Sequence, residues 1–523
     1  MSTRRHRKRM RGAVPVAIAG ALLASCAVGP DFHRPPPPAA SGYAPEPATE
    51  TVSTDIASGE TQRFLKDTDI PGEWWKLFGS EPLNELIEQA LRNNYDVLAA
   101  QAALRAATDN IYAQMGAFWP SINADFSATR GRTSAVVSPV LATPTTTYKL
   151  FTANASATYM PDVFGLNRRL VESARSQAES QRFLLEATYL TLTSNVVVAA
   201  IQEASLRGQI AAIEDIIRIE TDLLGLLRRQ YDLGQVAGLD VAAQEAALAQ
   251  AQQTLPPLQK QLHVQRDLLT ALVGSFPDRP PSQRFELASL HLPQDLPVSL
   301  PSQLVEQRPD IRQAEANLHT ASAQIGVAVA NRLPQLQLNA AYGAQEVIFS
   351  ALFSPSSIAW NITGAVVQPI FQGGTLLYRE RVARELLQQA AQQYRGAVIT
   401  AFQNVADALY ALQSDAIALK AADATERATR TSFELTQKQV ELGQANYLAL
   451  LQAQFAYLQA VVARVQAQAN RFSDTAALFQ ALGGGWWNRT DVGKQPDPVI
   501  PLQPADTYPA SVRNAGSDQP PPH

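Results

Sequence analysis

The stretch SINADFSATR (residues 121–130) alternates polar and apolar residues from Ser121 to Thr129. The apolar residues Ile122, Ala124, Phe126 and Ala128 stand between the polar residues Asn123, Asp125, Ser127 and Thr129. Successive side chains of a β-strand point to opposite faces, so a period of two is typical of a strand with two unlike faces. The stretch therefore predicts a strand with one apolar and one polar face.

Three further segments have the same alternation. They are LFTANASATY (150–159), PQLQLNAAYGA (334–344) and SIAWNITGAVV (357–367), and loops at 131–147 and 346–356 join the four segments into two hairpins. Transmembrane strands that face lipid on one side and water on the other have this pattern, although a half-buried soluble sheet gives it too. The pairing into hairpins, once in each half of the chain, favours the membrane interpretation.

Four strands cannot close a barrel that spans a bilayer, because open sheet edges leave backbone groups unsatisfied in hydrocarbon. Several chains must therefore each contribute four strands. Two copies would give eight strands and a bore filled by side chains, whereas three would give twelve and leave room for a lumen. The strand pattern alone does not choose between these two assemblies.

The two halves of the chain repeat each other. Residues 94–122 align without a gap on residues 308–336, which places Asp96 on Asp310 and Pro120 on Pro334 at a constant offset of 214. Further on, QYDLGQVAGLDV (230–241) matches QVELGQANYLAL (439–450) at an offset of 209. A duplicated structural unit explains both alignments.

Each repeat contains a long stretch without proline, at 162–255 and 370–482, that is rich in strong helix formers. A continuous helix from Gly165 to Leu233 would be about 100 Å long. Such a helix must lie beside others in a bundle, a coiled coil or a helical barrel. The helical stretches alone do not exclude the alternative that the protein is a plain coiled-coil rod.

The single cysteine, Cys26, follows six basic residues and an apolar run, which is the layout of a secretory signal peptide over residues 1–25. Leu23-Ala24-Ser25-Cys26 resembles the bacterial lipobox, whose cysteine receives S-diacylglycerol and N-palmitoyl lipid; an ordinary signal peptide with an incidental cysteine is the alternative. Ala27 implies sorting to the outer membrane. We expect no transmembrane helix beyond the signal, since the mature chain has no run of 18 apolar residues.

The predicted domain order follows from these patterns. After the signal peptide come a proline-rich, lipidated tether (26–72), a first repeat (73–275), a second repeat (276–487) and a disordered tail (488–523). The first repeat holds a hairpin at about 119–160 and a long helix pair at about 163–273, and the second holds a hairpin at about 334–369 and a helix pair at about 372–482.

Composition excludes several classes of function. Six of the 43 Lys and Arg residues lie in the signal, which leaves 37 against 47 Asp and Glu, a net charge of −10 that disfavours nucleic-acid binding. The six His residues have no metal-ligand spacing, and no phosphate-binding loop or nucleophile motif is found. The sequence therefore predicts no enzyme, no metal and no cofactor apart from the lipid on Cys26.

Several motifs together resemble one known family. They are CAVGPDFHRP (26–35), WWKLFGSEPLNELIEQAL (74–91), DVFGLNRRL (162–170), LVEQRPDIRQAEANL (304–318), QPIFQGG (368–374) and ALGGGWW (481–487). With them, residues 26–487 resemble the outer membrane factors, the TolC-like channels of tripartite efflux systems, and among these the NodT-type lipoproteins. The resemblance implies an α+β membrane protein: a homotrimer whose outer-membrane β-barrel of twelve strands, four per chain, continues into a long periplasmic α-helical barrel.

The resemblance also implies what the chain does. It implies passive conduction of drugs or other small molecules across the outer membrane, in partnership with a periplasmic adaptor and an inner-membrane pump of the RND or a similar type. Two alternatives stay open: the outer-membrane duct of a type I protein secretion system, and a structural periplasmic lipoprotein without a pore. The transported substrates are not legible from the sequence.

In this family the helix-turn-helix tips contact the adaptor and close the resting channel. The resemblance places the tips at Gly234, Gln235 and Gly238 and at Gly443, Gln444 and Asn446. It also suggests Asp240 as a gate residue, with Arg228, Arg229 and Tyr231 as partners, although Asp240 could equally cap its own helix. The second tip, ELGQANYLALLQAQ (441–454), has no Arg, and no Asp where some relatives form an acidic constriction. We therefore expect a less ionic gate at this tip and do not expect cation selectivity from an acidic ring.

Overall fold

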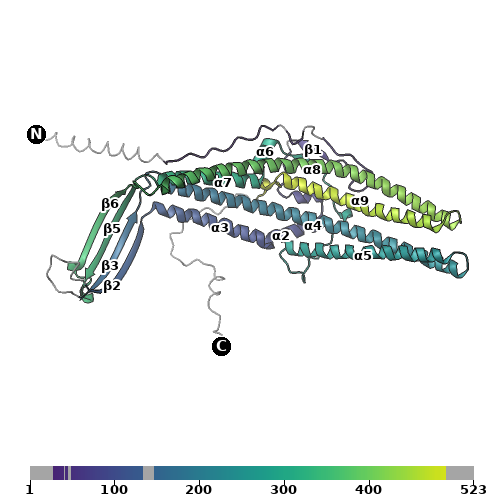
Figure 1. Cartoon of the computed structure of the whole chain (residues 1–523), viewed down its shortest axis with the longest axis horizontal. Helices are drawn as coiled ribbons and strands as arrows, with labels where there is room; N and C mark the ends of the chain where they lie inside the picture. Colours follow the sequence, from purple (N-terminus) through teal and green to yellow (C-terminus); the bar gives the residue numbers. More distant parts are fainter. Residues whose placement is uncertain (1–26, 41, 45–48, 67, 133–146, 491–523) are drawn as a thin grey trace, which may run out of the picture.

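We describe the chain from a computed structural model, in residues 27–490 apart from 41, 45–48, 67 and 133–146. The described part is elongated, with a β-sheet at one end and long helices along the rest (Figure 1). The predicted signal peptide, Cys26 and residues 491–523 of the predicted tail lie outside the described residues.

The four alternating segments form one antiparallel sheet. Its strands are β2 (Ser121–Arg132), β3 (Thr147–Tyr159), β5 (Gln335–Glu346) and β6 (Ile358–Val367), in the order β2-β3-β5-β6. All four lie within the hairpin ranges expected from the sequence. They are 10 to 13 residues long, which is enough to cross the hydrocarbon core of a bilayer when tilted.

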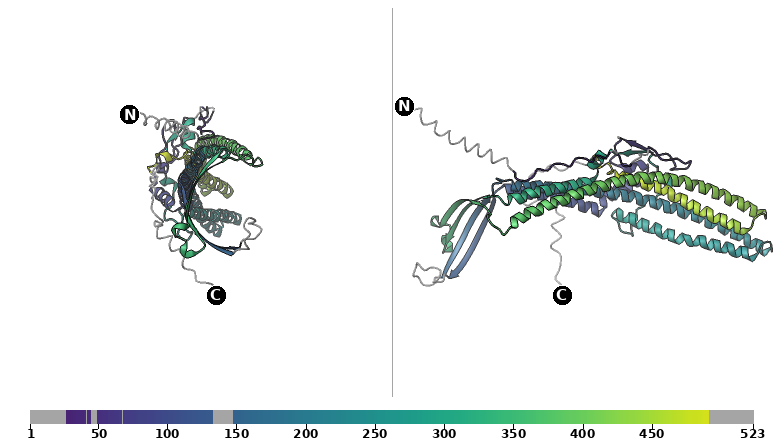
Figure 2. Two further views of the ribbon diagram at one scale, coloured as in Figure 1. Left: turned by 90° about the vertical axis from the view of Figure 1, so that its left-hand side faces the viewer. Right: turned by 45° about the horizontal axis from the view of Figure 1, so that its top comes forward.

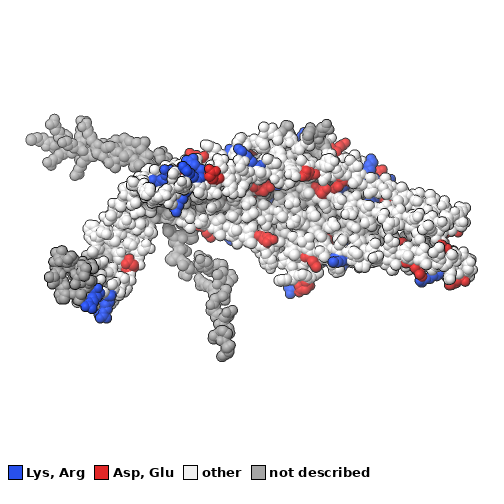
Figure 3. All heavy atoms as spheres, in the orientation of Figure 1, with Lys and Arg blue, Asp and Glu red and all other residues white. Residues whose placement is uncertain are grey.

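The strand register gathers most of the apolar residues of the four strands on one face. Phe126 pairs with Ala153, Ala155 with Tyr342, and Tyr342 with Trp360, and directly paired residues of antiparallel strands share a face. Much of this face is exposed, since Ile122 is 77% and Ile362 76% exposed. Phe349, in a short 3₁₀ turn after β5, covers one part of it by packing against Phe126 and Phe151. Figure 3 shows few charged side chains on the sheet, mostly near its far end.

The helices repeat in length as the sequence repeats. The long pairs are α4 (Leu166–Asp232) with α5 (Gly238–Leu272), and α8 (Thr375–Glu441) with α9 (Tyr447–Ala481); α4 and α8 have 67 residues each, and α5 and α9 have 35 each. The shorter helices are α2 (Glu81–Asn93), α3 (Tyr95–Met115), α6 (Pro301–Gln307) and α7 (Pro309–Ala330). The 3₁₀ turns are η1 (Trp74–Phe78), η2 (Gly116–Phe118), η3 (Leu287–Ser289), η4 (Phe349–Ala351), η5 (Pro355–Ser357) and η6 (Trp486–Asn488).

The helices continue the order of the strands. Helices α3, α4, α7 and α8 pack side by side in that order, and each leads into or out of one strand, so sheet and helices form a single curved wall (Figure 2). By length and composition alone, α4 and α9 each contain an 18-residue window apolar enough to cross a membrane. These windows include polar residues, so they are not the unbroken apolar runs considered in the sequence. However, α4 is about 100 Å long, some three times the hydrocarbon thickness, and 56% of its window is buried inside the protein.

The predicted tether is packed against the helices. We call the described residues of 27–66 the N-terminal strap; it runs along the helical wall (Figure 1). It ends in β1 (Arg63–Lys66), which pairs in parallel with β4 (Asp295–Val298) and was not expected from the sequence. Arg471 of α9, which is fully buried, donates hydrogen bonds to the carbonyls of Ser58 and Glu60 and to the Gln62 side chain.

Replacing Arg471 should loosen the strap. Arg471→Ala leaves the acceptors on Ser58, Glu60 and Gln62 buried without their donor, which we expect to cost about 3 kcal/mol of unfolding free energy. The apparent Tm should fall, and limited proteolysis should cut residues 41–66 faster. Arg218→Ala is the control, because Arg218 is an exposed α4 residue that pairs with a nearby aspartate, Asp215, on the same helix. Equal proteolysis rates for the two variants would contradict this role.

Candidate functional site

The first tip is the turn between α4 and α5, at the end of the molecule far from the sheet (Figure 1). Gly234 has a left-handed φ of 68°, which glycine adopts without steric cost. Its N–H donates to the Tyr231 carbonyl (2.9 Å), and the Gln235 N–H donates to the Gln230 carbonyl (2.8 Å). These bonds satisfy the last carbonyls of α4 and let the chain reverse before α5 begins at Gly238.

The second tip, between α8 and α9, has the same geometry. Gly443 has a φ of 70°, and the Gln444 N–H donates to the Gln439 carbonyl at 2.8 Å. Asn446 caps α9, because its side-chain oxygen accepts from the Ala449 N–H at 2.9 Å. The two turns lie at the same end of the chain (Figure 1), so all six residues expected at the tips are located there.

The gate candidates are not brought together within this chain. Asp240 Oδ2 accepts a hydrogen bond from the Ala237 N–H at 3.2 Å, which is a capping contact within its own helix. Arg228 instead pairs with Glu245 (Nη2 to Oε1, 2.7 Å), and the Tyr231 ring lies beside Gly238. The capping role of Asp240 is therefore present in the structure, while its gate role stays a prediction.

The bond that joins the two tips comes from Tyr447, a residue that sequence reasoning missed. Its hydroxyl donates to Gln230 Oε1 at 3.2 Å, across 217 residues of sequence. Burial, together with the negative charges of Asp240 and Glu441, raises the pKa of the Tyr447 hydroxyl. No motif marked Tyr447, because the repeat alignment places Gly238 at its position in the first half.

Apolar side chains cover the outside of both tips. Leu233 and Leu239 of the first turn are 72% and 78% exposed, and their counterparts Leu442 and Leu448 in the second are 71% and 61% exposed. Exposed apolar residues that gather in one place mark an interaction surface. Among the described residues, no three His, Cys, Asp or Glu side chains lie close enough to hold a metal ion.

Comparison with known families identifies the chain. The family model described as outer membrane efflux protein matches residues 86–275 and 300–484, one match in each repeat. The chain belongs to the outer membrane efflux protein family. This family forms efflux ducts of the outer membrane and is not a class of enzymes.

Named relatives and solved structures agree with this assignment. The efflux protein is 29% identical over 450 residues to the pyoverdine export outer membrane protein OpmQ of Pseudomonas putida, covering 84% of this chain and 94% of the relative. It is 27% identical over 485 residues to the toluene efflux pump outer membrane protein TtgC of the same species, covering 92% and 97%. The outer-membrane channel OprN superposes with a TM-score of 0.79 at 25% identity, covering 88% of this chain and all of OprN. The CmeC channel of Campylobacter jejuni gives the same TM-score at 21% identity, which supports the fold alone.

These findings confirm the predicted family, the efflux function and the outer-membrane location. The roles of individual tip residues and the lipid on Cys26 stay predictions.

Tyr447→Phe should weaken closure of the tips, because it removes the hydroxyl that bonds to Gln230. We expect a higher single-channel conductance in planar bilayers, and a smaller rise for Asp240→Ala, which removes only a cap and a nearby charge. Tyr457→Phe is the control, since Tyr457 lies in α9 away from the tip and accepts from Arg430. Tyr447 has no latching role if its variant and the control conduct equally.

Glu220 of α4 should make stability depend on pH. The residue is buried, and this burial raises its pKa to about 7. The folded state therefore holds a proton that the unfolded state releases above its ordinary pKa of 4.5, so stability should fall as the pH rises from about 4.5 to 7. Glu220→Gln should raise the apparent Tm at pH 8 and leave it nearly unchanged at pH 4.5; a uniform effect at both pH values would contradict this.

Proposed function

We propose that this protein is the homotrimeric outer-membrane channel of a tripartite efflux pump. The observation that carries the proposal is the sheet with one exposed apolar face and two free edges. Among the described residues β2 pairs only with β3, and β6 only with β5. In hydrocarbon those outer edges must be paired, and β6 of one copy meeting β2 of the next satisfies both.

A seam on α8 supports assembly with further copies. Tyr378 and Ile399 are exposed and stand three heptads apart, and the exposed Val382, Tyr410 and Ile417 are also separated by whole heptads. This spacing places the five residues in one stripe along the helix, as in the seam of a coiled coil. We propose that the stripe packs against the helices of a neighbouring copy. Three copies give twelve strands, which leave a lumen that eight would fill.

The channel conducts passively and draws its cargo from its partners. OpmQ and TtgC are named for export of pyoverdine and toluene, and we propose that this chain likewise carries small molecules. A periplasmic adaptor would contact the exposed leucines and the turn residues at the tips and link the channel to an inner-membrane pump of the RND or a similar type. The tips, held together by Tyr447, would form the gate, with Asp240 beside them.

Lipid on Cys26 would anchor each copy at the inner leaflet. Ala27, the next residue, packs against Gly165, where a Cβ would come within 2.6 Å of the Ala27 Cα. Gly165 directly precedes α4, just below the sheet. Two or more acyl chains give stable attachment, and this position would place them beside the lower rim of the barrel.

A pair of strand variants tests the membrane role of the sheet. Ile362→Lys puts a charge on the apolar face of β6, which should cost about 2 to 4 kcal/mol per copy in a bilayer and abolish channel insertion. Asn361→Lys, its neighbour on the polar face, should still form channels in planar bilayers. Wild-type particles should have the mass of three mature chains, and their N-terminal peptide should carry the lipid mass on Cys26.

Both strand variants are best made with Cys26→Ser behind a cleavable signal peptide, so that insertion reports the strands and not the acyl chains. The Cys26→Ser protein itself should still need detergent for extraction. Release as a soluble rod would favour a helical lipoprotein without a pore, and equal insertion of both lysine variants would show that the sheet does not face lipid.

A further inference from the structure

A pocket with four charged residues among its lining lies on α4 near the sheet. It is a hollow of about 450 Å³ lined by charged residues of the first turns of α4, by Phe118 at the end of η2 and by His319 of α7. The charged lining residues are Arg168, Glu172, Arg175 and Glu179.

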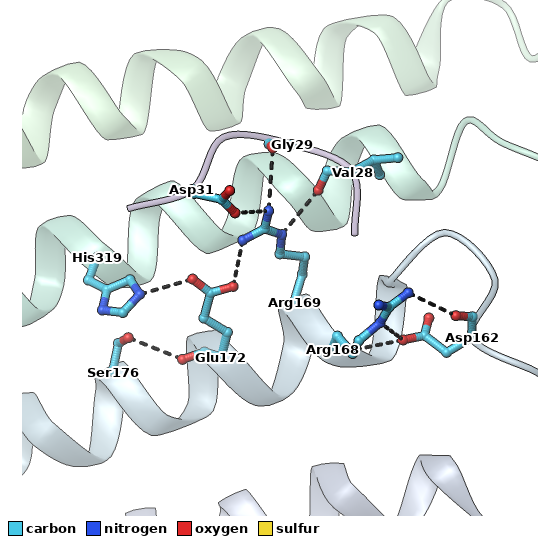
Figure 4. A network of polar contacts seen from close by, with 9 residues as sticks. All are labelled: Val28, Gly29, Asp31, Asp162, Arg168, Arg169, Glu172, Ser176 and His319. Carbon is cyan, nitrogen blue, oxygen red and sulfur yellow. Dashed lines mark hydrogen bonds and ion pairs between the residues drawn. The ribbon is translucent and has the colours of Figure 1, made fainter. Parts of the chain in front are cut away.

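One wall of the pocket is the contact that holds the strap (Figure 4). Arg169, next to the pocket, is buried and donates to the carbonyls of Val28 and Gly29, to Asp31 and to Glu172. Glu172 also lies 2.9 Å from His319 Nε2, and the His319 ring stacks on Phe32 of the strap at 4.3 Å. The strap lies on the convex side of the curved wall (Figure 2), so the part of the pocket lining formed by His319, which stacks on Phe32, faces that side.

The pocket stands at the depth of the inner-leaflet headgroups, if the sheet spans the membrane as proposed above. Three exposed apolar residues lie at the strand ends nearest the helices. Trp119 precedes β2 and is 75% exposed, and Ile370 and Phe371 follow β6 and are 89% and 87% exposed. Such residues are expected at a membrane interface. Arg168 lies in the first turn of α4, and Arg175 follows it by seven residues, about 10 Å. Helical side chains tilt toward the N-terminus, so both arginines lean toward the sheet.

The charges of the pocket alternate along one face of α4, and three of the four have a counter-charge outside the pocket lining. Arg168 is bound to Asp162, Glu172 to Arg169, and Glu179 lies 3.7 Å from Arg312. For Arg175, which is exposed, no ion pair is found among the described residues. The pocket thus offers cationic and anionic groups about one helical turn apart, next to the aromatic side chain of Phe118.

We propose that this pocket binds the zwitterionic headgroup of a phospholipid, with the phosphate on Arg175 and Arg168 and the amine toward Glu179. Arginine suits phosphate because its guanidinium donates two parallel hydrogen bonds. Positive and negative groups in alternation match a phosphate followed by an amine, whereas a purely anionic headgroup would face Glu172 and Glu179. Phe118 then packs against the glycerol and the upper acyl carbons.

The test titrates short-chain lipids onto the purified, assembled full-length protein in detergent. Dihexanoyl-phosphatidylethanolamine, dihexanoyl-phosphatidylglycerol and inorganic phosphate are the three probes, and calorimetry gives the Kd values. The wild-type protein should bind the ethanolamine lipid at least about tenfold more tightly than the other two probes. Arg175→Gln should weaken that binding about tenfold, while Arg218→Gln, an exposed arginine further along α4, should leave it unchanged.

Glu179→Gln is the second variant, and it should remove the preference for ethanolamine over glycerol. The proposal is overturned if Arg175→Gln binds like the wild type, if inorganic phosphate binds as tightly as the ethanolamine lipid, or if Glu179→Gln keeps the preference. Conductance in planar bilayers tests the proposed channel function separately from headgroup binding by the pocket. A conducting wild type with no headgroup binding overturns only the pocket, whereas absent conductance overturns the channel.

Discussion

The structure depends on one constraint, that a peptide group in hydrocarbon must find its hydrogen bond within protein. Each chain supplies a sheet of four strands with an apolar outer face, and its first and last strands leave rows of donors and acceptors unpaired among the described residues. The proposed association with further copies would pair these edges in the membrane. The helices follow the same arrangement. Each strand is joined to one helix, and the helices α3, α4, α7 and α8 are neighbours in the same order as the strands β2, β3, β5 and β6.

The long helices extend that order well beyond the membrane. Helix α4 packs against α3, α5, α7 and α9, and its stability comes from this packing along its whole length. The strap adds to this packing on the outside: Arg169 holds it near the membrane, and Arg471 holds it farther along the wall. Both arginines are buried, and each donates to two backbone carbonyls of the strap as well as to strap side chains. The strap is therefore fixed by its backbone path and by its side chains together.

Much of the fold could be predicted because its signals are local and periodic. Alternation placed the four strands, the proline-free stretches placed the long helices, and the repeated Gly-Gln turns placed both tips. The contacts that were missed join residues far apart in sequence. Tyr447 meets Gln230 across 217 positions, and Arg471 meets Ser58 across 413. No period or spacing reports such pairs, because each depends on how whole helices are set against each other.

The two repeats have a similar backbone but differ in the side chains that make contacts. Gly165 and Gly374 precede α4 and α8 with the same φ of 82°, so the residues that follow them occupy equivalent places. Four residues on, the first repeat has Arg169, buried beneath the strap, and the second has Tyr378, exposed on the α8 stripe. The first helix therefore carries the contacts toward the strap and the proposed lipid pocket, and the second carries the stripe proposed to contact the next copy. The tips differ in the same way, since Tyr447 of the second repeat aligns with Gly238 of the first. The duplication explains the similar backbone of the two halves, and different residues at equivalent positions explain why the two halves make different contacts.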